Sequence, residues 1–184
     1  MKRLLSVVAL LATTACGPAW VVVKQANPDP FVGAKKFTVA VDAAGMKLNG
    51  KNEADFTAKG PEEKAGWEKS KESFTTNFLE SFKAKAKDAG YEIVEADAQG
   101  AIKVMPGDID LGYFVGISGG PSLTNITVQV ATPDGNVQDE VTMRAQTPGN
   151  IYNPTPDARI RSDGIQLGKL VVKYLDNRTA AAPK

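Results

Sequence analysis

Histidine is absent from the 184-residue sequence, and Cys16 is its single cysteine. Histidine is the commonest general base in enzymes and the commonest transition-metal ligand. Its absence excludes Ser-His-Asp and Cys-His catalysis, and a lone cysteine cannot build a zinc site of the Cys/His type. Catalysis by carboxylates, lysine, tyrosine or a Ser-Lys pair stays open.

Three aspartates, Asp108, Asp110 and Asp139, are the candidate catalytic carboxylates. A glycoside hydrolase needs two such groups about 5–10 Å apart in a cleft. Asp108 and Asp110 could also begin a calcium loop, but the remaining ligands of an EF-hand do not follow. Asp139 lies on the apolar side of a predicted strand, and we interpret it as a residue near a wet turn rather than a buried carboxylate. We therefore expect no catalytic residue, no metal site and no cofactor.

Residues 112–122 contain four glycines around Tyr113 and Phe114. A glycine-rich phosphate loop is followed by a helix and usually carries a lysine. Here Pro121 and a predicted strand follow, so we expect a mobile loop. Tyr113 and Phe114 are the candidate binding residues of this loop, and a small-ligand module is one alternative function.

The strongest helix is predicted between Pro61 and Gly90. Proline suits the first turn of a helix, and glycine suits the left-handed conformation at its end. Large apolar residues recur between them at helical spacing, which predicts a buried face packed on a sheet. These residues are Trp67, Phe74, Phe78, Phe82 and Ala86.

Alternation of apolar and polar residues between 126 and 145, around the turn Pro133–Asn136, predicts a β-hairpin with one buried face. Shorter strands are predicted at 37–41, 91–94 and 101–105, with a polar loop at 42–59 and a turn at 106–112.

A second helix is predicted after Thr155, which can cap it. We expect Gly164 and Gly168 to let this helix approach the sheet closely. We expect Arg159 and Arg161 to pair with carboxylates or to lie in solvent.

These elements predict an α+β fold, a two-layer sandwich with a largely antiparallel sheet and two helices on one face. The predicted organisation is a signal peptide at 1–15, a tether at 16–34, one domain at 35–178 and a disordered tail at 179–184. Without Lys2 and Arg3, the 22 basic residues become 20 against 21 acidic ones. This balance gives no electrostatic reason to expect nucleic acid as a partner.

The N-terminus combines Lys2 and Arg3, an apolar run and the segment Leu11-Ala12-Thr13-Thr14-Ala15-Cys16-Gly17. The apolar run is shorter than the roughly 20 residues that span a bilayer. The segment resembles the lipobox of bacterial lipoproteins, with Ala15 before Cys16 as that family requires and Thr13 where it prefers leucine. The resemblance implies that Cys16 receives a diacylglyceryl group and is acylated after cleavage. Gly17, where an aspartate favours retention in the inner membrane, implies the outer membrane, facing the periplasm.

The body of the chain resembles a group of bacterial envelope lipoproteins of unknown function, through short structural motifs. These are Phe31-Val32-Gly33 to Phe37-Thr38-Val39, Phe78-Leu79 to Gly90, Pro133–Asn136 with Asp139-Glu140, and Arg159 to Gly168 with Tyr174-Leu175. The resemblance implies the fold and the location, and it brings no catalytic or binding residues with it.

The leading hypothesis is a non-enzymatic, membrane-anchored lipoprotein that binds or scaffolds other envelope proteins or cell-wall components. The alternatives are the small-ligand module and a carboxylate-dependent envelope hydrolase. Trp20–Val23 is interpreted as a strand or tether lying against the domain, or alternatively as a membrane or partner contact.

Overall fold

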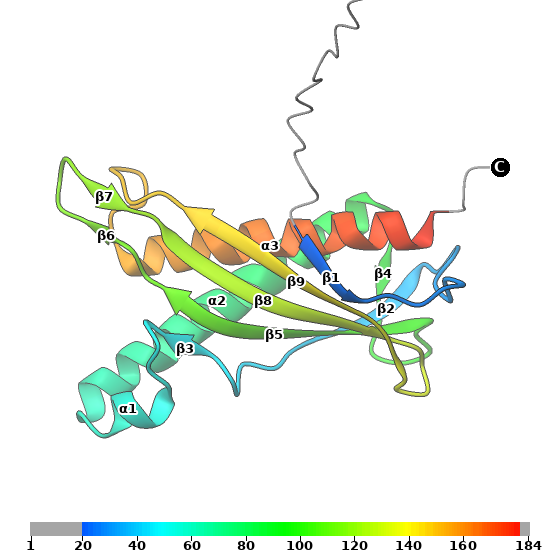
Figure 1. Cartoon of the computed structure of the whole chain (residues 1–184), viewed down its shortest axis with the longest axis horizontal. Coiled ribbons are helices and arrows are strands. Elements are labelled where there is room, and N and C mark those ends of the chain that lie inside the picture. Colours follow the sequence, from blue (N-terminus) through cyan, green and yellow to red (C-terminus); the bar gives the residue numbers. More distant parts are fainter. Residues whose placement is uncertain (1–19, 181–184) are drawn as a thin grey trace, which may run out of the picture.

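The computed structural model describes residues 20–180. Cys16 and the predicted signal peptide lie outside the described residues, as do residues 181–184 of the predicted tail. The described chain forms a mixed α+β structure in which two long helices cover one face of a twisted sheet (Figure 1). The predicted fold class is confirmed.

The main sheet has seven strands, and six of them lie side by side in the order β1-β9-β8-β5-β2-β4, while β3 pairs with the far part of β5. The pairs β1–β9, β9–β8 and β8–β5 are antiparallel, whereas β2 and β3 pair with β5 in parallel and β4 pairs with β2 in parallel. The strands are β1 (Trp20–Lys24), β2 (Lys36–Val41), β3 (Lys47–Leu48), β4 (Glu92–Ile93), β5 (Gly100–Asp110), β8 (Ser122–Ala131) and β9 (Val137–Thr147).

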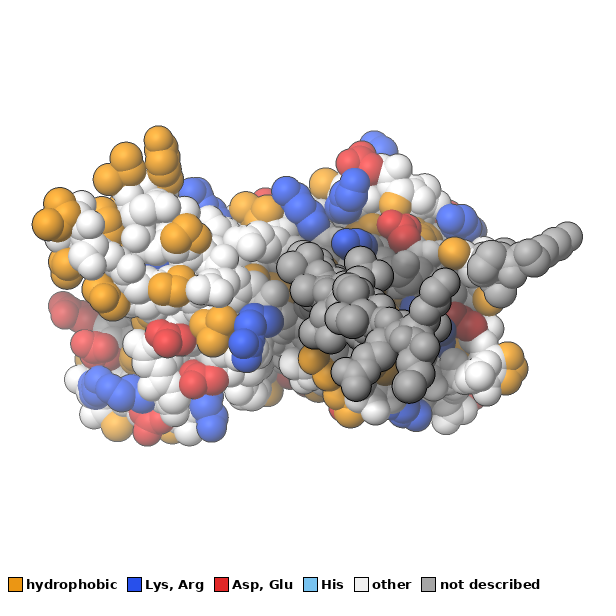
Figure 2. Space-filling view, turned by 45° about the horizontal axis from the view of Figure 1, so that its top comes forward, with side chains coloured by type: hydrophobic (Ala, Val, Ile, Leu, Met, Phe, Trp, Pro, Cys, Tyr) orange, Lys and Arg blue, Asp and Glu red, His pale blue; other side chains and the backbone are white. Residues whose placement is uncertain are grey.

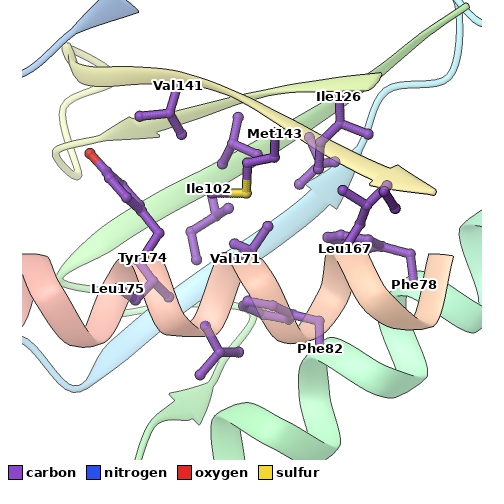
Figure 3. Close-up of a cluster of buried hydrophobic side chains, with 14 of the residues drawn as sticks. Phe78, Phe82, Ile102, Ile126, Val141, Met143, Leu167, Val171, Tyr174 and Leu175 are labelled. Carbon is purple, nitrogen blue, oxygen red and sulfur yellow. The ribbon is translucent and has the colours of Figure 1, made fainter. Parts of the chain in front are cut away.

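Helix α2 (Pro61–Asp88) buries the predicted aromatic stripe. The rings of Phe74, Phe78 and Phe82 stack along it, with neighbouring centroids 6.1 Å apart. Helix α3 (Pro156–Thr179) begins after Thr155, whose side chain accepts a hydrogen bond from the N–H of Ala158. Side chains of α3 point between the sheet and α2, as Figure 3 shows. Both helices therefore share one continuous core with the buried face of the sheet.

Gly164 and Gly168 allow a close approach, but to α2 rather than to the sheet. A β-carbon on Gly168 would lie 2.7 Å from the carbonyl oxygen of Phe78, and one on Gly164 would lie 3.0 Å from that of Phe74. The expectation of a glycine contact with the sheet was wrong because the sheet-facing side of α3 carries large side chains such as Leu167 and Val171.

Two local predictions also need correction. The loop predicted at 42–59 contains a short helix, α1 (Glu53–Thr57), whose N-terminus is closed by reciprocal hydrogen bonds between Asn52 and Asp55. The turn predicted at 106–112 is mostly strand, because a bulge after Pro106 lets β5 continue to Asp110.

Strand β1 pairs with β9, so residues 20–24 lie in the sheet, as the strand interpretation expected. Trp20 packs edge-to-face against Tyr174 of α3, with centroids 5.6 Å apart. Trp20 lies opposite Met143, and this pairing fixes where the described chain enters the domain.

Candidate functional site: two uncharged loops at one end of the sheet

Two loops lie together at one end of the sheet and form the candidate site. The first, residues 112–121, is a hairpin of β6 (Tyr113–Phe114) and β7 (Gly119–Gly120), and the second is residues 148–155, between β9 and α3. We call them the loop pair. Neither segment contains a charged residue, although 23% of the whole chain is charged.

Glycines bring the two backbones of the loop pair into direct contact. A β-carbon on Gly149 would lie 2.2 Å from the carbonyl oxygen of Tyr113, and one on Gly119 would lie 2.2 Å from that of Gly149. The segment predicted as an irregular, mobile loop is instead a hydrogen-bonded hairpin packed on its neighbour. Gly119 and Gly149 serve close packing, because any larger residue would hold the backbones apart.

The loop pair exposes large apolar side chains. Ile117 is fully exposed at the hairpin tip, and Tyr152 of the second loop is 82% exposed. Tyr113, Val115 and Ile151 are also exposed. Figure 2 shows hydrophobic side chains projecting at this end of the molecule. Several large apolar side chains exposed together are typical of a binding or membrane-contact site.

Arg159, in the first turn of α3, holds both loops through backbone carbonyls. Its Nε donates to the carbonyl oxygen of Leu111 at 2.8 Å, next to the hairpin, and its Nη1 donates to those of Asn153 and Pro154 at 3.0 and 3.1 Å. The side chain is buried. We had expected Arg159 to pair with a carboxylate or to lie in solvent, and the structure corrects that expectation. Carbonyl oxygens of the loops, close to the start of α3, accept the hydrogen bonds that a carboxylate was expected to accept.

Asp163, one helical turn further along α3, closes the base of the loop pair. Its carboxylate is wholly buried and accepts hydrogen bonds from three hydroxyls. Ser122 and Thr124 donate to Oδ2 at 2.8 Å each, and Thr147 donates to Oδ1 at 2.6 Å. Among residues 20–180, no ion pair includes Asp163. Hydroxyl donors alone therefore compensate this buried carboxylate.

The positions of these hydroxyls explain what Asp163 does. Ser122 begins β8 directly after the hairpin, and Thr147 ends β9 directly before the second loop. Arg159 and Asp163 are four residues apart and lie on one side of α3. One helix face thus fixes the roots of both loops, while their tips project into solvent.

A hollow of about 370 Å³ lies beside Tyr113, lined also by Leu123 and Gln146. Beneath the hairpin, on the helix side, Arg159 and the Asp163 cluster fill the interior. Tyr113 therefore borders a shallow surface hollow rather than an apolar pocket, and the half-buried Phe114 lies next to it in β6.

Asp139 lies far from the other two candidate catalytic aspartates, Asp108 and Asp110, which are two residues apart on the exposed side of β5. Asp110 lies in β5 opposite Leu123 of β8, whereas Asp139 lies in β9 opposite Val130 of β8. Seven residues of strand separate these positions, or about 24 Å. That distance is too long for a pair of glycosidase carboxylates. In residues 20–180, no group of three or more Cys, Asp or Glu side chains is placed to hold a metal ion.

Asp139 is not near a wet turn, and this prediction was wrong. Its carboxylate is wholly buried and accepts a bidentate pair from Arg178, with Nε–Oδ2 at 2.6 Å and Nη2–Oδ1 at 3.0 Å. Tyr174 and the N–H of Ala26 donate to the same carboxylate. Arg178 also pairs with Asp29 at 2.7 Å. This cluster ties the chain after β1 to the last turns of α3.

Electrostatics in this second cluster are strongly coupled. Burial and the hydrogen bond to Asp139 raise the pKa of Tyr174 well above its ordinary value. Burial alone would lower the pKa of Arg178, but the hydrogen bond and charge of Asp139 raise it. Sequence reasoning missed Asp163 and misjudged the burial of Asp139, although charged residues on the apolar side of α3 were a usable signal.

A larger hollow, about 680 Å³, lies between the C-terminal part of α2 and the edge formed by β2 and β4. Lys83 and Lys87 line it from the helix, while Glu92 and Glu95 line it from the other side. Because charges of both signs line this open surface, water and neighbouring opposite charges can satisfy them. The hollow is therefore not specific for a ligand of one charge.

Among residues 20–180, no helix has both the length and the apolar character needed to cross a membrane. No family model matches the sequence, and no curated protein matches it significantly.

Several solved structures are similar in part to this chain. A PelC dodecamer from Paraburkholderia phytofirmans is 14% identical and covers 82% of this chain and 97% of its own, with a TM-score of 0.43. A minor lipoprotein from Acinetobacter baumannii is 13% identical over 81% and 98% of the two chains, with a TM-score of 0.48. A Xanthomonas campestris protein of the family DUF330 is 9% identical over 85% and 95%, with a TM-score of 0.45. At these identities and scores, no residue role is transferred from them.

Proposed function

We propose that the protein is a lipid-anchored bacterial envelope protein that binds another envelope component through the loop pair and catalyses no reaction. The anchor part of the proposal rests on Cys16 within its lipobox-like segment. A lone cysteine in an exported chain has no disulfide partner within the chain, and lipidation gives it a chemical role. The outer membrane, facing the periplasm, is the proposed location.

The binding part of the proposal rests on one observation. Two loops without charge, exposing aliphatic and tyrosine side chains, are held in place by buried Arg159 and Asp163. A buried carboxylate costs free energy unless its hydrogen bonds are made, so its position under these loops constrains them strongly. Pre-ordered apolar loops bind with a smaller entropy cost than loops that must order first.

The alternatives have less support in the geometry. Asp139 is buried in its pair with Arg178 and lies far from Asp108 and Asp110. Those two accept hydrogen bonds from the N–H groups of Gly50 and Gly112 on the exposed side of β5, so the geometry gives a carboxylate-dependent hydrolase little support. The filled interior beneath Tyr113 offers a small ligand only a shallow surface hollow. A binding surface for another macromolecular or lipid component fits the exposed loops better.

The anchor is tested by labelling cells with palmitate and fractionating them. We expect the wild-type protein to carry label and to stay with the membrane. The Cys16→Ser variant should lose the label and appear in the soluble periplasmic fraction. Label that persists in Cys16→Ser, or a wild-type protein without label, would contradict the anchor.

Binding is tested by placing a photo-crosslinking residue at Ile117 or Tyr152 in intact cells. The matched control is Ala84, which is exposed on α2 and far from the loop pair in sequence. We expect crosslinked products from both loop positions and not from Ala84. Equal yields from all three positions would contradict a specific role for the loop pair.

A further inference from the structure

We propose that the loop pair enters the surface of the same lipid bilayer that holds the anchor, and so forms a second membrane contact. This inference rests on the proposed anchor at Cys16 and names lipid as the component that the loops bind. It would make the domain lie against the membrane in a fixed orientation, rather than hang from a flexible tether.

The composition of the loop pair matches a membrane interface. Charged side chains are costly to bring into lipid, and segments 112–121 and 148–155 have none. Ile117 and Ile151 supply exposed aliphatic groups, while Tyr113 and Tyr152 supply aromatic rings with a polar end. Tyrosine is enriched at the level of lipid headgroups for this reason.

Part of the backbone of the loops is paired internally, which lowers the cost of leaving water. In the hairpin, β6 pairs with β7, and the N–H of Val115 donates to the carbonyl oxygen of Ser118 at 2.9 Å. In the second loop, the side chain of Asn150 accepts from the N–H groups of Tyr152 and Asn153 at 2.9 and 3.0 Å. These bonds reduce the number of backbone groups that lose a partner when the tips leave water.

The anchor lies within reach of the root of the second loop. Cys16 precedes Trp20 by four residues, which span at most about 14 Å. Trp20 lies opposite Met143, and β9 continues from there for four residues to Thr147, at the root of the second loop, or about 14 Å.

A protein partner fits the same surface less well. Protein interfaces combine an apolar centre with a polar, often charged rim and a complementary shape. The loop pair is instead a projection without charged residues, and the side chain at its tip, Ile117, is fully exposed. A bilayer requires neither a charged rim nor shape complementarity.

The experiment uses full-length, lipidated protein reconstituted into vesicles of phosphatidylethanolamine and phosphatidylglycerol. Lipidation consumes the thiol of Cys16, so Ile117→Cys, Tyr152→Cys and the control Ala84→Cys each carry one free thiol for an environment-sensitive fluorophore. These side chains are exposed, so the substitutions leave the core intact. Fluorescence is recorded with and without lipids that carry a spin-label quencher on their acyl chains.

We expect the probes at residues 117 and 152 to shift to shorter emission wavelengths and to be quenched by the spin-labelled lipid, while the probe at residue 84 shows neither change. Vesicle flotation separates the two claims. Protein that floats with vesicles but shows no shift or quenching at residues 117 and 152 would overturn the bilayer contact and leave the anchor standing. Protein that fails to float would overturn the anchor, and the bilayer contact with it.

Discussion

The two ends of helix α3 bury charge in different ways. Near its start, Asp163 is surrounded by the hydroxyls of Ser122, Thr124 and Thr147. Near its end, Arg178 forms a bidentate pair with Asp139 of β9. We call these the hydroxyl cluster and the ion-pair cluster. Each fastens a different irregular segment to the same helix.

The segments differ in what they do. The hydroxyl cluster, together with Arg159, supports the loop pair, whose tips are exposed and apolar. The ion-pair cluster holds the chain that leaves β1, through Ala26 and Asp29. In the proposed function, that chain lies just after the lipid anchor. One helix therefore braces both the proposed binding loops and the segment next to the proposed attachment point.

The comparison has an energetic consequence. Removing one partner from a buried ion pair leaves an uncompensated charge, whereas removing a carboxylate from a set of hydroxyls leaves only neutral groups. Removing a residue from the ion-pair cluster should therefore lower the free energy of unfolding more. Removing Asp163 from the hydroxyl cluster should act more locally. Substitutions in the two clusters test this difference.

Replacing Arg178 should have the largest effect. The Arg178→Met variant leaves the buried Asp139 carboxylate with Tyr174 and the N–H of Ala26 as its remaining donors. We expect its free energy of unfolding to fall by about 3–5 kcal/mol, measured by urea denaturation. Adding Asp139→Asn removes the unpaired charge, so the double variant should be more stable than Arg178→Met alone. A double variant that is less stable would contradict the role of charge.

Replacing Asp163 should cost less and act locally. Asp163→Ala leaves three buried hydroxyls without their acceptor, and we expect a loss of about 2–3 kcal/mol in the free energy of unfolding. Amide hydrogen exchange should accelerate in residues 112–121 and 148–155, while residues 20–31 stay protected. Asp163→Asn keeps the shape and one acceptor oxygen, so it should lose less. Uniform acceleration over the whole chain would contradict a local role.

Much of the fold follows from sequence periodicity. The apolar stripe of α2 and the alternation in β8 and β9 state directly which faces are buried, because one helix or one hairpin contains the whole pattern. The spacing of Asn52 and Asp55 is that of a capping box and was an unused signal for α1, because the polar composition around it favoured a loop. Such local signals need no knowledge of distant residues.

The clusters could not be predicted in the same way. Asp139 becomes a buried residue because Arg178, 39 positions later, reaches it from the last turn of α3. Asp163 is tolerated in the core because three hydroxyls from two strands converge on it. The sequence does place Arg159 and Asp163 at a spacing of four on the same side as Leu167, which is an anomaly in an apolar face. That anomaly indicates a buried polar cluster without naming its partners.

Gly149→Ala tests whether backbone contact fixes the loop pair. The added methyl group would meet the carbonyl oxygen of Tyr113, which cannot move without shifting the hairpin. We expect a loss of about 1–3 kcal/mol in the free energy of unfolding. The control is Gly66→Ala in the interior of α2, where the new β-carbon meets no neighbour within 4 Å. That variant should gain about 0.5–1 kcal/mol from helix propensity. A loss in both variants would argue against the specific contact.

Tyr174→Phe separates the two clusters by their response to alkaline pH. At neutral pH the lost hydrogen bond to Asp139 should cost about 1 kcal/mol. Above about pH 10, an unfolded tyrosine releases its proton. Folded Tyr174, whose pKa is raised by burial and by Asp139, retains its proton. The unfolded state then binds fewer protons than the folded state, so stability falls as the pH rises.

Each such tyrosine contributes about 1.4 kcal/mol per pH unit to that fall. Tyr91, whose pKa is also raised by burial, remains in the variant and keeps its own contribution. Denaturant unfolding between pH 9 and pH 11 should therefore show a shallower decline in Tyr174→Phe than in the wild type. Gly149→Ala removes no titrating group and should keep the wild-type slope. If Tyr174→Phe also kept the wild-type slope, the raised pKa of Tyr174 would not be a source of the alkaline sensitivity. The ion-pair cluster would then not differ from the hydroxyl cluster in its response to pH.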